Sequence, residues 1–80
     1  MTEDAIAMLD DIIRKNAYAI MRTERRSKDL IRIEKRWATN ESPRHCEIAQ
    51  AKLETNQRVG ELLKHLQSIL KEVRHELQSL

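Results

Sequence analysis

The first 42 residues of this 80-residue chain contain neither glycine nor proline. These are the two residues that most often interrupt helices, so nothing in this stretch ends one. Within it, Ile6, Ile13 and Ile20 recur every seven residues, the interval that keeps side chains on one side of a helix in a coiled coil. The apolar pattern resumes at Leu30 and Ile31. We therefore predict one long helix over about residues 3–38.

A second helix follows the single break in this pattern. Ser42 can cap a helix, and Pro43 is tolerated at its first position. Apolar residues then recur at helical spacing to the end of the chain, at Ile48, Ala49, Leu53, Val59, Leu62, Leu63, Leu66, Ile69, Leu70, Val73, Leu77 and Leu80. Gly60 costs about 1 kcal/mol relative to alanine, which packing can offset. The sequence predicts a turn at 39–42 and a helix over about 43–79.

The two predicted helices form one all-α domain over residues 1–80. Two helices of similar length joined by a short turn pack as antiparallel neighbours, so the predicted fold is a helical hairpin. The chain has no Phe and few turn residues, which excludes a β-rich domain. Trp37 is predicted to be buried near Ile33, Cys46 and Ala49.

Both helices become polar at the same level. Folding the chain about residues 40 and 41 sets a polar set from the first helix (Thr23, Glu24, Ser27) opposite one from the second (Glu54, Asn56, Gln57). Polar side chains within a coiled-coil contact can fix the register and the number of partners. The alternative is that the helices separate here in water.

The apolar residues of the second helix from Val59 onward cover an arc of about 120°, which is broader than one neighbouring helix covers. The first helix is similarly broad at its start. A second hairpin would cover the remaining surface, so we predict a homodimer that forms a four-helix bundle or coiled coil, with assembly on a different chain as the alternative. The predicted dimer interface is Ile6, Leu9, Ile13, Ile20, Leu62, Leu66, Ile69 and Val73.

Positive charge is concentrated on the first helix. Residues 14–44 hold ten Lys or Arg against four Asp or Glu, whereas residues 45–80 hold five of each. At 100° per residue, seven of these cations fall within an arc of about 120° opposite the apolar side. We call them the basic stripe: Arg14, Lys15, Arg22, Arg25, Arg26, Arg32 and Arg36. A helix dipole favours cations in its last turn but does not explain Arg14 to Arg26.

The basic stripe spans about 33 Å along the helix axis. Arginine forms paired hydrogen bonds with phosphate, and a helix of this length can follow the backbone of a duplex. This favours a non-enzymatic module that binds duplex nucleic acid through backbone and shape, double-stranded RNA more than DNA. The alternative is an oligomerisation or adaptor module that acts through protein contacts, with an acidic partner for the stripe. In size and layout the hairpin resembles the small dimeric helical proteins by which some RNA viruses sequester double-stranded RNA. It equally resembles oligomerisation hairpins at the ends of larger proteins and small coiled-coil adaptor subunits.

Other functions lack the residues that they require. The histidines and Cys46 do not have the spacing of a metal site, and no catalytic set or cofactor motif is present. The sequence therefore predicts no enzyme, no metal and no cofactor. A single cysteine and the lack of a signal peptide or an apolar span predict an intracellular, cytoplasmic protein without a membrane role.

Overall fold

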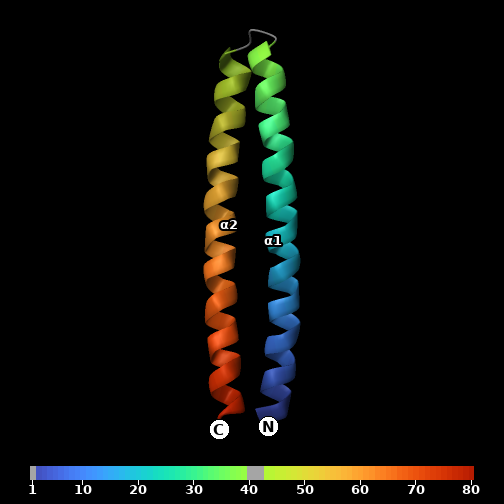
Figure 1. The fold of residues 1–80 in the computed structure, drawn as a ribbon, viewed down its shortest axis with the longest axis vertical. Coiled ribbons are helices and arrows are strands. Elements are labelled where there is room, and N and C mark those ends of the chain that lie inside the picture. The colour runs from blue at the N-terminus through green and yellow to red at the C-terminus, as the bar shows by residue number, and fades with distance from the viewer. Residues whose placement is uncertain (1, 40–42) are drawn as a thin grey trace.

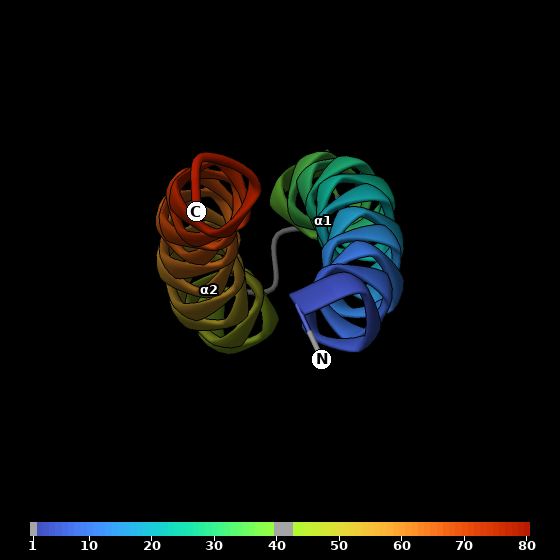
Figure 2. The ribbon, with the colours of Figure 1, turned by 90° about the horizontal axis from the view of Figure 1, so that it is seen from below.

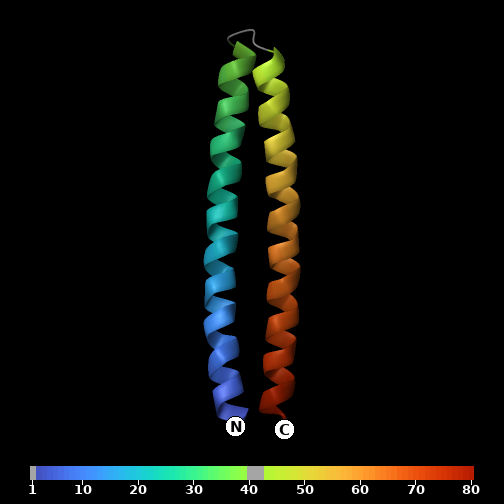
Figure 3. The same ribbon diagram turned by 180° about the vertical axis from the view of Figure 1, so that it is seen from behind.

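The computed structural model describes residues 2–39 and 43–80, with side chains throughout except at 37–39. Two α-helices, α1 (Thr2–Thr39) and α2 (Pro43–Gln78), lie antiparallel and side by side (Figure 1). The hairpin measures 60 by 14 by 12 Å, and both termini lie at the same end, as the rear view in Figure 3 also shows. The predicted all-α antiparallel hairpin is confirmed. The turn, the Ser42 cap and the surroundings of Trp37 lie outside the described residues.

Charged residues at the two ends of α1 suit its helix dipole. Glu3 and Asp4 occupy the first turn of α1, and Arg36 lies in its last turn. Each sign of charge lies at the end that stabilises it. The helix is one residue longer at each end than the sequence predicts, and α2 starts at the expected proline.

The contact between the helices is a coiled coil. In α2, the residues that are not exposed recur at intervals of three and four; they are Cys46, Ala49, Leu53, Asn56, Gly60, Leu63, Gln67, Leu70, Arg74 and Leu77. The same intervals occur in α1 at Ile6, Leu9, Ile13, Asn16, Ile20, Thr23, Ser27, Leu30 and Glu34. We call these two series the seam. A repeat slightly shorter than the helical period makes helices wind around each other, as the view along the long axis shows (Figure 2).

Hydrogen bonds fix the register at the polar middle of the seam. The Asn56 Nδ2 donates to the Thr23 carbonyl oxygen at 2.8 Å and to the Ser27 Oγ at 2.6 Å. Polar residues therefore meet at this level as predicted, and the helices do not separate there. At the same level, the Glu24 carboxylate lies 3.4 Å from the Lys64 ammonium. A long lysine side chain at the edge of the seam reaches this carboxylate, whereas a facing glutamate would repel it.

The hairpin buries little of its apolar surface. Among the described residues the buried apolar side chains are Leu30, 3% exposed, and Ala49, 4% exposed. The polar Asn16 is also buried, at 7% exposed. Two helices can cover each other along only one side, so most of the large apolar side chains remain in contact with water.

Candidate functional site

A second series of apolar residues runs along α2 outside the seam. Val59, Leu62, Leu66, Ile69 and Val73 are all exposed, and their intervals are again three and four residues. We call these five residues the apolar stripe. Leu62, at 69% exposed, protrudes furthest of the five. Apolar residues at this spacing form a surface that fits another helix.

The stripe exists because α2 carries two apolar series on one broad arc. Leu63 and Leu70 belong to the seam, and each lies one residue after a member of the stripe. One residue turns a helix by about 100°, so when the seam series faces α1 the stripe must face aside. The neighbouring helix can cover only one of the two series.

The stripe lies on one broad face of the hairpin. Exposed apolar side chains on the same face extend it, namely Met8 and Ile12 of α1, Ile48 near the start of α2, and Leu80. On the opposite edge of the seam α2 carries Gln50, Gln57, Lys64 and Lys71. Along α2 the two edges of the seam therefore differ in polarity, and the apolar stripe is the edge suited to packing.

The eight residues predicted to form a dimer interface lie on two different surfaces of the hairpin. Four of them lie in the seam within the hairpin, half-buried against α2: Ile6, Leu9, Ile13 and Ile20. The other four lie on the apolar stripe: Leu62, Leu66, Ile69 and Val73. Of the predicted interface, the half on α2 is therefore the half that remains exposed. The predicted set omits Val59 and Ile48, although their spacing from Leu62 and Leu66 was already visible in the sequence.

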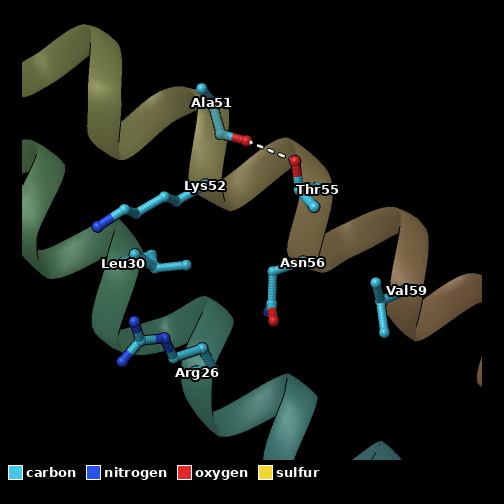
Figure 4. A pocket seen from close by; sticks show the side chains of 7 residues that line it. All are labelled: Arg26, Leu30, Ala51, Lys52, Thr55, Asn56 and Val59. Carbon is cyan, nitrogen blue, oxygen red and sulfur yellow. Dashed lines mark hydrogen bonds between the residues drawn. The ribbon is translucent and has the colours of Figure 1, made fainter.

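A hollow adjoins the stripe in the half of the hairpin nearer the turn. Figure 4 shows its lining, with Arg26 and Leu30 of α1 on one side and residues of α2, among them Lys52, Asn56 and Val59, on the other; the residues are Arg26, Leu30, Ala51, Lys52, Thr55, Asn56 and Val59. The Thr55 hydroxyl donates to the Ala51 carbonyl oxygen at 3.0 Å, so its hydrogen-bonding capacity is directed into its own helix. The hollow is open to solvent and combines positive charge with an apolar floor.

All seven residues of the basic stripe are exposed, on the part of α1 that α2 does not cover. They gather in two patches. The first patch combines Arg14, Lys15 and Arg22 with Asp11 and Tyr18. The second combines Arg26, Arg32 and Arg36 with Asp29 and Ile33. Arg25 is exposed between them.

Asp11 neutralises part of the first patch, a pairing that the sequence prediction missed. Its carboxylate lies 2.9 Å from the Lys15 ammonium and accepts a hydrogen bond of 2.7 Å from Arg14. Hydrogen bonds, from Lys15 first and Arg14 second, lower the pKa of Asp11 below its ordinary value. No ion pair involves the other five arginines of the stripe within the described part of the chain. Among the described residues, the basic stripe is therefore partly neutralised at Arg14 and Lys15 and forms no ion pair at its other five members.

A metal site and a membrane span each place a requirement on the described residues. Over residues 2–36 and 43–80, no group of three His, Cys, Asp or Glu side chains lies together as a metal site requires. Cys46 is half-buried in the seam. Within the described residues, neither helix carries an apolar segment long enough to cross a bilayer.

The features that could serve a function are thus two surfaces, the apolar stripe of α2 and the basic stripe of α1. No protein-family model, curated protein or solved structure matches this chain.

Proposed function

We propose that this chain is a non-catalytic assembly module that forms a homodimer through the apolar stripe of α2. The observation that carries the proposal is a second, exposed coiled-coil series on a helix whose first series already packs in the seam. Continuous apolar surfaces of this kind on soluble proteins mark interaction sites. A second hairpin would remove the stripe from water and convert two thin hairpins into a four-helix arrangement.

Sedimentation equilibrium over a range of concentrations tests the proposal. The native chain should sediment as a dimer, and Leu62→Glu should sediment as a monomer because it places a charge in the apolar contact. Met21→Glu is the matched control, since Met21 is 60% exposed on the outer side of α1, away from the stripe. Both variants should keep their helical circular dichroism. A native monomer, or a Leu62→Glu dimer as tight as the control, would contradict the proposal.

A second candidate function is binding to duplex nucleic acid through the basic stripe. The specific observation in its favour is that five exposed arginines on one side of α1 lack an ion-pair partner among the described residues. An unpaired guanidinium can bind phosphate without first breaking an intramolecular ion pair. Recognition would depend on backbone and shape, with double-stranded RNA favoured over DNA.

A mobility-shift titration with a generic RNA duplex at about 50 and 200 mM salt tests this second function. For five phosphate contacts, the counterion coefficient of B-form duplexes predicts an affinity loss of about 500-fold between the two salt concentrations. Arg25→Ala and Arg32→Ala should each reduce the salt slope by about 0.9, whereas Lys71→Ala on α2 should leave it unchanged. Absence of a shift at the lower salt concentration would remove this function and leave assembly untouched.

A further inference from the structure

We propose that α2 packs antiparallel against α2 of a second copy, with a two-fold axis that crosses the contact between Leu62 and Leu66, at the level of residue 64. The inference rests on the proposed assembly function and specifies its geometry. It follows from matching the apolar stripe and its charged neighbours with the same surface after a two-fold rotation.

In this register the apolar residues of the two copies meet in successive layers. Leu62 faces the partner's Leu66, and Val59 faces the partner's Ile69. Further from the axis, Thr55 faces the partner's Val73. At the ends of the contact, Ile48 faces the partner's Leu80. Along each helix, successive layers are separated by three or four residues in alternation, as an antiparallel coiled coil requires.

The same register also pairs opposite charges. Lys52 faces the partner's Glu76 within the series of layers, and Arg58 faces the partner's Glu72 along its edge. All four side chains are exposed, and in the described part of the chain none of them forms an ion pair. Because the axis repeats each pair, the dimer gains four opposite-charge pairs. Complementary charges beside an apolar contact fix register and orientation.

Other arrangements of the two helices fit less well. A parallel pair would set Lys52 against Lys52 and Glu76 against Glu76, which places like charges together. Shifted by one heptad in one direction, an antiparallel pair sets Val59 against the partner's Glu76 and leaves Ile48 without a partner. Shifted by one heptad in the other direction, it sets the charged Lys52 against the partner's apolar Ile69. Only the proposed register matches both the apolar and the charged positions.

The hollow beside the stripe fits the end of the partner helix. Arg26 and Lys52 provide two cations there, and Val59 provides part of the apolar floor (Figure 4). The proposed register brings the partner's Val73 and Glu76 to this point. An apolar side chain followed by a carboxylate complements a hollow that combines an apolar floor with positive charge.

The dimer also brings the two basic stripes together. A two-fold axis perpendicular to α2 places both copies of α1 on the same side of the α2 pair. Lys15, Arg22 and Arg26 lie on the α1 edge that borders this side, so six cations from two copies surround the axis. Such a surface suits a polyanion that spans both copies.

A charge exchange tests the register. Lys52→Glu and Glu76→Lys should each weaken the dimer about tenfold by sedimentation equilibrium, because each change creates two like-charge pairs. The double variant should recover an affinity within about threefold of the native chain. Residues 52 and 76 are about 36 Å apart along one helix, so the recovery must come from contacts between copies.

The control double variant combines Lys52→Glu with Glu61→Lys, which has the same net charge but does not restore the pair. It should remain as weak as Lys52→Glu. Zero-length coupling of amines to carboxylates should also join Lys52 to Glu76 in the covalent dimer, as mass spectrometry would detect. If Leu62→Glu abolishes the dimer but the charge exchange recovers nothing, the register is wrong and the assembly function stands. If the native chain is monomeric, both fail.

Discussion

The contact between Gly60 and Thr23 permits a quantitative test of the seam. Glycine within a helix costs about 1 kcal/mol relative to alanine, so Gly60→Ala should stabilise α2 by that amount if space allows. A Cβ at this position would lie 3.3 Å from the Thr23 Cγ2, closer than the usual contact of about 3.5–4.0 Å between carbon atoms. Thr23 resists displacement because its hydroxyl donates to the Ala19 carbonyl oxygen at 2.7 Å and its carbonyl oxygen accepts from Asn56. We therefore expect Gly60→Ala to change the free energy of unfolding by less than about 0.5 kcal/mol, because gain and crowding cancel.

Thr23→Ser removes the obstructing methyl group and keeps the hydroxyl. In that background Gly60→Ala should raise the free energy of unfolding by about 1 kcal/mol, or the melting temperature by about 4–8 °C. The four proteins of this double-mutant cycle should be melted at one protomer concentration, since the stability of an assembly depends on concentration. Equal stabilisation by Gly60→Ala in both backgrounds would show that the Thr23 methyl does not face Gly60, which would refute the register of the hairpin.

Two further predictions concern the seam and the basic stripe. The side-chain oxygens of Asn16 and Gln67 are buried without a hydrogen bond among the described residues. The double variant Asn16→Leu with Gln67→Leu should therefore raise the free energy of unfolding by about 2 kcal/mol in urea titrations. A loss of stability would mean that these amides form hydrogen bonds in the native protein. Asp11→Asn should tighten binding to an RNA duplex several-fold at about 50 mM salt, because it frees Arg14 and Lys15; unchanged affinity in the mobility shift would place these two cations outside the contact.

The lowered pKa of Asp11 determines how the stability contributed by its pairs with Arg14 and Lys15 changes with pH. A carboxyl group whose pKa is lower in the folded chain contributes stability above its unfolded pKa and loses it as the pH falls through the folded value. Since the group is exposed, the effect on unfolding is small. Near neutral pH the pairs with Arg14 and Lys15 are intact, so at that pH only the substitution releases the two cations.

The helices could be predicted from the sequence because each one repeats a local pattern over more than thirty residues. The hairpin followed from their matched lengths, and the meeting of Asn56 with Thr23 and Ser27 followed from folding one polar segment onto the other. These features depend on neighbouring residues and on chain length alone.

The division of the apolar residues could not be predicted in the same way. Leu62 and Leu63 belong to two series that are equally apolar. Which series forms the seam depends on the side of α2 against which α1 packs. On α1, by contrast, Ile6 and Ile13 were predicted to form an interface between chains but pack against α2 within the hairpin. The neutralisation of the basic stripe was missed because Asp11 precedes the segment in which charges were counted, although it lies within one turn of Arg14.

The two candidate functions are linked if both are real. A duplex that contacts both copies of α1 binds the dimer more tightly than the monomer, and linkage requires that the duplex then favours dimerisation by the same factor. Leu62→Glu, which lies outside the basic stripe, should therefore weaken RNA binding in mobility shifts, whereas Gln57→Glu, on the opposite edge of α2, should not. Conversely, the duplex should raise the dimer fraction of dilute native protein in cross-linking experiments. If Leu62→Glu abolishes the dimer and leaves RNA affinity unchanged, each hairpin binds alone, and the apolar stripe serves assembly independently of the basic stripe.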